Sequence, residues 1–139
     1  PGRPTDSLRI RTKELKALLK REDFQWLRQP EEPYIQEEWP CNAGREACCI
    51  SAEGKVYPCV ALRRECGDLR REPFEAIWNL SPVFKEVRGY EIRDFKKCHR
   101  CRWRERCRFC PGMGFFEHGD MLRPSRETCR MTRAAADEG

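Results

Sequence analysis

Ten cysteines, which fall into two groups of five, constrain the fold of this 139-residue chain more than any other feature. One group lies within residues 41–66 and the other within residues 98–129. Charged residues make up 37% of the chain, so its apolar core is expected to be thin. Small chains with thin cores depend on disulfides or bound metal. No secretory signal is recognisable, and close-set cysteines without secretory features indicate metal.

The second cysteine group has the more specific spacing. Four cysteines stand within thirteen residues as Cys98-x2-Cys101-x5-Cys107-x2-Cys110, and Cys129 follows. Two short C-x2-C pairs are compatible with a tetrahedral zinc site, although zinc ribbons separate their pairs by a longer stretch. A dense run that ends in Cys-Pro, as at Cys110, is closer to ferredoxin-type ligation. The spacing therefore favours an iron–sulfur cluster and leaves zinc as the alternative.

The first cysteine group surrounds a predicted β-hairpin. Strands are expected at 49–51 and 55–57, and Gly54 suits the left-handed position of the three-residue loop between them. Such a hairpin brings Cys41 and Cys59, which are distant in the sequence, close together. A single zinc site would leave half of the thiols unused, so the count of ten favours two metal sites.

Two cysteines in this group are adjacent, and only one of them can take the ligand position on the side of the hairpin that faces the metal. Cys48 and Cys49 point to opposite faces of a strand. A three-residue loop places Cys49 on the face of Cys59, whereas a bulge near the end of the hairpin would place Cys48 there. Both remain candidates from the residues alone. Cys66 matches no ligand position and is expected to be a buried free thiol.

Short helices are predicted outside the cysteine groups. One begins at Thr12 and ends near Leu27, and two more lie within residues 73–89. Phe74, Ile77 and Trp78 recur at helical spacing and are expected to face the core. Together with the hairpin, these segments predict an α+β fold: a small metal-organised domain with a β-hairpin, short helices and cysteine-rich loops.

Three stretches follow a pattern that is shared by a known family. They are Cys41-Asn42-Ala43-Gly44 with Cys48, Ile50 and Gly54-Lys55-Val56-Tyr57-Pro58-Cys59; Gly67-Asp68-Leu69-Arg70 with Phe74 and Ile77-Trp78; and the Cys98–Cys110 group with Cys129. These stretches resemble the opening, middle and close of the SPASM domain of radical SAM enzymes, which include sulfatase maturases and peptide-modifying enzymes. The resemblance covers residues 41–131. Residues 1–40 are then expected to be a C-terminal remnant of a radical SAM barrel plus a linker, and residues 132–139 a flexible tail.

The resemblance implies two auxiliary 4Fe–4S clusters. One is implied to use Cys41, Cys48, Cys59 and Cys110, and the other Cys98, Cys101, Cys107 and Cys129. The implied roles are electron relay and substrate seating in an enzyme that modifies a peptide or small protein. The partner is the barrel domain of the parent chain, which would hold S-adenosylmethionine (SAM) and a third cluster.

Two departures from the family pattern bear on this expectation. The family usually has three residues between the cysteines that match Cys107 and Cys110, whereas this chain has two. The superfamily's catalytic C-x3-C-x2-C signature is absent, so the isolated chain is expected to be inactive, and no catalytic residue is assigned.

The net charge of +5 has two explanations. A 4Fe–4S cluster with four thiolates carries a charge of about −2, so two clusters would lower the formal charge to about +1. The alternative is a zinc-stabilised module whose basic stretch contacts nucleic acid or protein. The basic residues interleave with the cysteines, which favours the first explanation, and nucleic acid is not expected as a partner. No apolar run is long enough for a membrane span, and a cytoplasmic location is expected.

Overall fold

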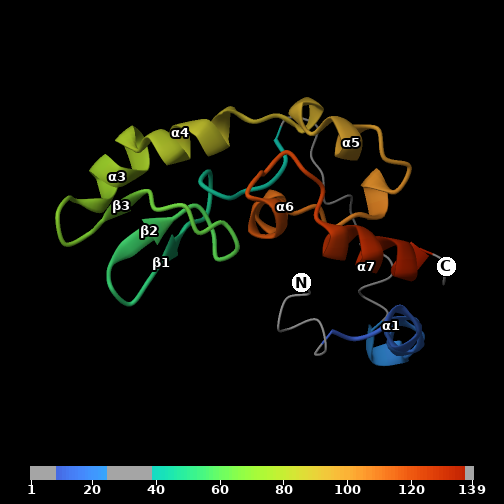
Figure 1. The fold of residues 1–139 in the computed structure, drawn as a ribbon. Coiled ribbons are helices and arrows are strands. Elements are labelled where there is room, and N and C mark those ends of the chain that lie inside the picture. The colour runs from blue at the N-terminus through green and yellow to red at the C-terminus, as the bar shows by residue number, and fades with distance from the viewer. Residues whose placement is uncertain (1–8, 25–38, 137–139) are drawn as a thin grey trace.

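The computed structural model describes residues 9–24 and 39–136. Within them it confirms the expected α+β class: a small antiparallel sheet lies at one end of the molecule and further helices at the other (Figure 1). The helices are α1 (Thr12–Leu19), α3 (Phe74–Leu80), α4 (Pro82–Gly89), α5 (Lys96–His99), α6 (Pro111–His118) and α7 (Arg126–Ala136). The strands are β1 (Cys49–Ile50), β2 (Lys55–Tyr57) and β3 (Gly67–Asp68), and short 3-10 turns are η2 (Glu22–Phe24), η3 (Ile92–Asp94) and η4 (Arg104–Arg106).

The predicted hairpin is confirmed. β1 pairs antiparallel with β2, with Ile50 opposite Val56, and the Ser51 amide donates to the Lys55 carbonyl at 2.9 Å. Gly54 closes the three-residue loop with φ +80°, a conformation that a residue with a Cβ rarely adopts. β3 adds a third strand beside β2, so Val56 lies in the middle of the sheet and is fully buried.

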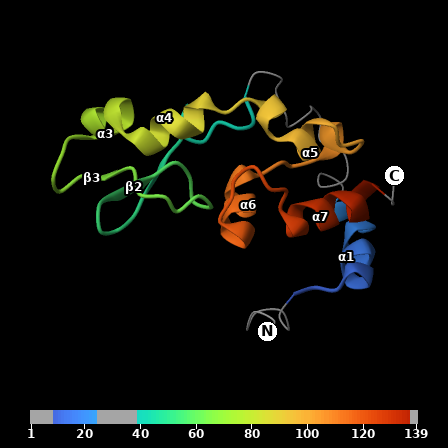
Figure 2. The same ribbon diagram turned by 45° about the horizontal axis from the view of Figure 1, so that its top comes forward.

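The two short helices expected within residues 73–89 are α3 and α4, which cover one face of the sheet (Figures 1 and 2). α4 begins with Pro82, whose fixed φ suits the first turn of a helix. Ile77 from α3 and Phe84 from α4 pack on Val56 as one buried cluster. A second cluster joins Leu62, Val87 and Met121, and it ties α4 to the loop after β2 and to the segment after α6.

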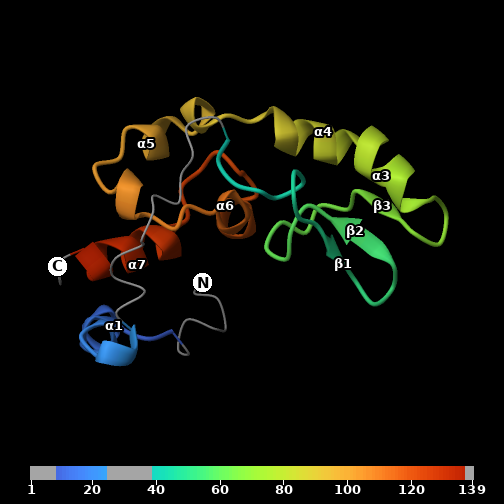
Figure 3. The ribbon, with the colours of Figure 1, turned by 180° about the vertical axis from the view of Figure 1, so that it is seen from behind.

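The first helix and the last helix lie side by side, as the views from the front and from behind agree (Figures 1 and 3). Leu15 and Leu19 of α1 pack against Ala134 of α7, which is only 1% exposed. The prediction that the first helix extends to about Leu27 is wrong, because α1 ends at Leu19 and a 3-10 turn follows. Leu27 itself and most of the expected linker lie outside the described residues.

The expected start of the flexible tail at Thr132 is also wrong. α7 continues to Ala136, and Thr132 and Ala134 are buried. The polar composition of this segment indicated fraying, but the apolar side of α1 covers it, and packing of this kind supplies most of the stability of helices in proteins. Residues 137–139 lie outside the described part of the chain.

Helix α6 lies between the two ends of the molecule (Figure 1). The sheet with α3 and α4 is on one side of it, and α5, α7 and α1 are on the other. Its N-terminus follows Cys110 directly, and Gly119 with φ +71° ends it in the left-handed conformation that commonly terminates helices. In the described residues no helix combines the length and apolar character that crossing a membrane requires.

Candidate metal centres

Four thiols from separate segments meet at the end of the molecule near α7. Cys98 lies in α5, Cys101 and Cys107 flank η4, and Cys129 lies in α7. Burial raises the pKa of Cys98 to about 12, and the negative charges of Cys129, Cys107 and Cys101 add to this rise. Each of these thiols is thus close enough to the others for their charges to interact. We call this group the second site.

Three thiols meet at a different place, next to α6. Burial raises the pKa of Cys41, and the charges of Cys59 and Cys110 raise it further. The pKa of Cys110 is also raised, first by burial and then by Cys59. All three line one small apolar cavity with Leu62, Val87 and Phe109. We call these three thiols the first site.

The first site offers backbone N–H groups to its sulfurs. The Leu62 amide donates to Cys59 Sγ at 3.3 Å. Backbone hydrogen bonds from Gly112 and Met113, at the start of α6, lower the pKa of Cys110 against the larger effect of burial. Amides at a helix N-terminus have no partner within the helix and favour negative charge, so this position suits a thiolate.

Gly112 allows the start of α6 to lie close to the loop that follows Cys59. A Cβ on Gly112 would lie 2.9 Å from Ala61 Cβ and 3.2 Å from the Leu62 amide nitrogen, closer than real Cβ atoms are normally found to their neighbours. With glycine here, α6 can lie directly against the loop that follows Cys59. The first turn of α6 therefore brings Cys110 to Cys59 although fifty residues separate them in the sequence.

The remaining three cysteines lie elsewhere. Cys48 and Cys66 pack against the core cluster of Val56, Ile77 and Phe84. The charged groups that chiefly shift the pKa of Cys41 are Cys59, Cys110 and Arg45, and neither Cys48 nor Cys49 is among them. The regular register of the hairpin explains this placement, because Cys48 then shares the core-facing side of Val56. The structure thus gathers three of the four thiols implied for one cluster, and the role of Cys48 as a ligand stays a prediction.

Cys66 is half-buried, and burial raises its pKa to about 11. Its Sγ lies 3.7 Å from the Arg64 carbonyl oxygen, to which it can donate. Cys66 also contacts the apolar core cluster, and its role as a free thiol stays a prediction.

Cys110 lies near Cys41 and Cys59, and Cys129 lies near the other thiols, which is compatible with the crossed arrangement; the assignment of these thiols to two clusters stays a prediction. Among the described residues, no three Cys, His, Asp or Glu side chains are arranged to hold a single metal ion. The donor set of both sites is made of thiols, the ligands that iron–sulfur clusters take. Burial raises the pKa of five of them, which favours the neutral thiol, so binding of a cluster there would release protons; the five are Cys41, Cys98, Cys107, Cys110 and Cys129.

The sequence profile of the SPASM family, an iron–sulfur cluster-binding domain, matches residues 41–111, just over half of the chain. The chain belongs to the SPASM family. The profile includes the three thiols of the first site and the first three thiols of the second.

Three relatives of this SPASM domain are named AdoMet-dependent heme synthase. The protein from Methanosarcina barkeri is 35% identical over 83 residues, which cover 59% of this chain and 23% of that protein. The protein from Nitratidesulfovibrio vulgaris is 35% identical over 82 residues, 59% of this chain and 22% of that protein. The protein from Oleidesulfovibrio alaskensis is 37% identical over 82 residues, 59% of this chain and 21% of that protein. No solved structure gave a significant match.

The loop that carries Cys41 in the SPASM domain is held by Arg88 of α4. The Arg88 guanidinium donates to the carbonyls of Gly44 and Trp78, and it stacks 4.5 Å from the centre of the Trp78 ring and 4.9 Å from that of Phe84. Gly44 has φ +71°, and a Cβ there would lie 2.9 Å from the Phe84 ring. α4 therefore fixes the path of the chain just after Cys41.

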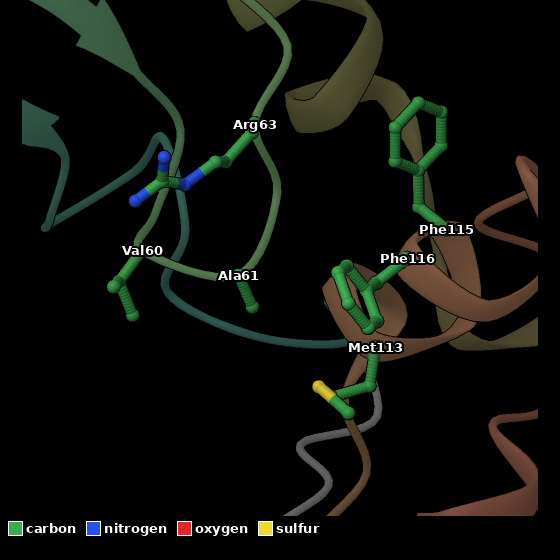
Figure 4. Close-up of a pocket in the computed structure, with 6 residues that line it drawn as sticks. All are labelled: Val60, Ala61, Arg63, Met113, Phe115 and Phe116. Carbon is green, nitrogen blue, oxygen red and sulfur yellow. The ribbon is translucent and has the colours of Figure 1, made fainter. Parts of the chain in front are cut away.

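An open groove lies beside the first site (Figure 4). Val60 and Ala61, directly after Cys59, face Met113 and Phe116 of α6 across it. Its volume is about 390 Å³, and Val60 and Phe116 are 74% and 65% exposed. Arg63 and Phe115 complete the lining. Exposed apolar side chains that gather in this way indicate a binding surface.

Sequence reasoning did not identify two further residues at the sites. Thr132 places its hydroxyl 3.4 Å from Cys107 Sγ, but the sequence prediction assigned it to a tail. Glu117 of α6 accepts hydrogen bonds from the Ser125 hydroxyl and the Arg126 amide, at 2.7 and 2.6 Å, at the start of the helix that carries Cys129. Serine before a helical segment is a capping signal that could have located the start of α7.

Proposed function

We propose that this SPASM domain binds two 4Fe–4S clusters and serves as the auxiliary-cluster part of a radical SAM enzyme. The family match supports iron–sulfur binding, and the names of the relatives support an enzyme that uses SAM. Cys98, Cys101, Cys107 and Cys129 would hold one cluster. Cys41, Cys59 and Cys110 would hold the other, with Cys48 as the fourth ligand. The clusters would supply one-electron transfer.

The observation that carries the proposal is the convergence of thiols from distant segments. Cys129 approaches Cys98 although η4 and α6 lie between them, and Cys110 approaches Cys41 and Cys59 instead of its neighbours in the sequence. Buried thiols with raised pKa values are unfavourable sites for isolated charges, but a cationic iron–sulfide core would offset the charge of the thiolates. The crossed arrangement also links the two halves of the chain.

Within the parent, we propose that residues 1–40 are the end of the barrel and a linker, and that the barrel is the partner of this domain. The match spans less than a quarter of each relative, so most of each relative lies outside it. The barrel would hold SAM and a third cluster. This domain would relay electrons and help to seat the substrate.

For the substrate, the names of the relatives favour haem synthesis, whereas the resemblance alone implied a peptide or small protein. We propose that the groove beside the first site seats a haem precursor. Met113, Phe115 and Phe116 offer an apolar, partly aromatic lining to a flat macrocycle. Arg63 at the same groove would pair with a carboxylate of such a substrate.

Iron and sulfide analysis after anaerobic reconstitution tests the two clusters. Two cubanes predict about eight iron and eight sulfide per chain. A plateau near four iron would contradict the second cluster. One or two zinc ions without sulfide would favour a zinc-stabilised binding module instead.

Paired variants test the crossed arrangement. Cys110→Ala should perturb the EPR signal of the cluster at the first site, and Cys129→Ala that of the cluster at the second. Loss of the same signal in both variants would show that both cysteines serve one cluster.

Absorbance titration with haem tests the groove. The reconstituted domain should bind haem, and Phe116→Ser should weaken binding about tenfold because it removes most of an exposed apolar contact. Leu80→Ser, which alters an equally exposed side chain of α3, is the control. Equal affinity in both variants would exclude Phe116 from the binding surface.

A further inference from the structure

The second site has a hydroxyl group pointed at one of its sulfurs. Thr132 Oγ1 lies 3.4 Å from Cys107 Sγ, and Thr132 is only 7% exposed. Thr132 therefore offers a hydrogen-bond donor to a sulfur that the proposed function assigns as a cluster ligand.

Thr132 has two possible acceptors for a single proton. Its hydroxyl also lies 2.9 Å from the Thr128 carbonyl oxygen, one turn earlier in α7. Threonine in a helix commonly bonds to this carbonyl. Hydrogen bonds to a charged acceptor are roughly twice as strong as those between neutral groups, so a thiolate at Cys107 would be the better acceptor.

The helix that carries this hydroxyl also carries a thiol of the same site. Cys129 and Thr132 are three residues apart in α7 and so lie on one face of it. α7 thus delivers a candidate ligand and a hydrogen-bond donor together. At the first site the donors are the amides of Leu62, Gly112 and Met113, which no side-chain substitution removes.

We propose that Thr132 is a positioning residue that donates its hydroxyl proton to Cys107 Sγ and thereby raises the reduction potential of the cluster at the second site. This rests on the proposed function. Reduction adds an electron to the cluster, so a donor to a ligand sulfur stabilises the reduced form more than the oxidised form. The second cluster then accepts electrons more readily than it would without this hydroxyl.

The test is a redox titration of the reconstituted chain followed by EPR. Thr132→Val keeps the shape of the side chain and removes the hydroxyl, and it should shift the midpoint of the second cluster to a more negative potential. Thr132→Ser keeps the hydroxyl and should leave the midpoint close to that of the unaltered chain. The midpoint of the first cluster should not move in either variant.

Two further variants separate the hydroxyl from packing. Thr132→Ala removes the hydroxyl in a residue that favours helix, so it tests the same shift if Thr132→Val fails to assemble. Thr128→Val alters the neighbouring turn, which lines the same cavity, but leaves the Thr132 hydroxyl in place, and it should cause no shift.

The outcomes distinguish this inference from the proposed function. If Thr132→Val or Thr132→Ala binds eight iron and the midpoint potential of its second cluster is unchanged, the role of Thr132 is overturned and the proposal of two clusters stands. An equal shift in Thr132→Ser and Thr132→Val would assign the effect to packing and overturn it as well. An unaltered chain that binds only four iron, all at the first site, would overturn both proposals.

Discussion

Gly114 sets how closely α6 can approach the segment that leads to α7. A Cβ on this residue would overlap the backbone carbonyl oxygen of Arg123, an atom that cannot move aside as a flexible side chain could. The same substitution has a different consequence at Gly89, the last residue of α4, where a Cβ would meet nothing within 4 Å. The two helical glycines therefore offer a matched comparison at the scale of single residues.

We expect Gly114→Ala to destabilise the reconstituted protein by about 2 kcal/mol, because overpacking forces the backbone apart. Gly89→Ala should be neutral or stabilising by up to about 1 kcal/mol, because alanine favours helix more than glycine does. Apparent melting temperatures at one scan rate, followed by circular dichroism under anaerobic conditions, compare the two variants. Equal melting temperatures would show that the contact between α6 and Arg123 is not tight.

At the scale of elements, α7 depends on its neighbour α6 for its start. Glu117 accepts hydrogen bonds from the Ser125 hydroxyl and the Arg126 and Glu127 amides, and the Ser125 hydroxyl oxygen accepts from the Thr128 amide at 3.0 Å. Burial raises the pKa of Glu117, but these hydrogen bonds outweigh it and hold the pKa below the ordinary value of 4.5. The carboxylate therefore stabilises the fold above pH 4.5, and this contribution is lost as the pH falls through the lowered pKa.

Glu117→Gln should destabilise the protein by about 1 kcal/mol at neutral pH, because it removes the charge that favours the N-terminus of α7. It should also reduce the occupancy of the second site, since Cys129 lies in the first turns of this helix. Thermal unfolding and iron analysis measure the two effects. Glu105→Gln, at an exposed position, is the control, and an equal loss of stability in both variants would contradict the capping role.

For the whole molecule, the apolar core is divided into three small clusters. One joins α1 to α7, one lies between the sheet and α3 and α4, and one lies under the loop after β2. Divided cores of this size supply little stability for a chain with so many charged residues. The first site borders the cluster of Leu62, Val87 and Met121, and the second site includes Cys129 of α7, so bound metal would add links that this divided core lacks.

Removal of the clusters should therefore cost the chain its fold between residues 41 and 131. We expect the amide resonances of this region to lose their dispersion in NMR spectra of chelated protein. Cys66→Ala, which removes a thiol outside both sites, should retain about eight iron and the dispersed spectrum. A sharp, dispersed spectrum of the metal-free chain would show that the apolar clusters suffice.

Much of the local structure was predictable because it depends on neighbours in the sequence. The hairpin follows from Gly54, because its loop needs a residue that adopts the left-handed conformation easily, and from the alternating residues on either side of the loop. α3 and α4 follow from helical spacing and from Pro82. The spacing of Cys98, Cys101 and Cys107 likewise places these thiols close together in any compact loop.

What the sequence determined by itself is the set of thiols, their local spacing and the small elements that carry them. Only the tertiary structure decided that Cys110 lies with Cys41 and Cys59, that Cys48 packs against the sheet cluster while only partly buried, and that Thr132 stands beside Cys107 in a helix. These placements depend on contacts between distant segments: Gly112 against Ala61, the packing of Phe84, and α1 covering α7. Residue spacing cannot specify such contacts, because the free energy that selects them comes from surfaces that meet only after the chain has folded.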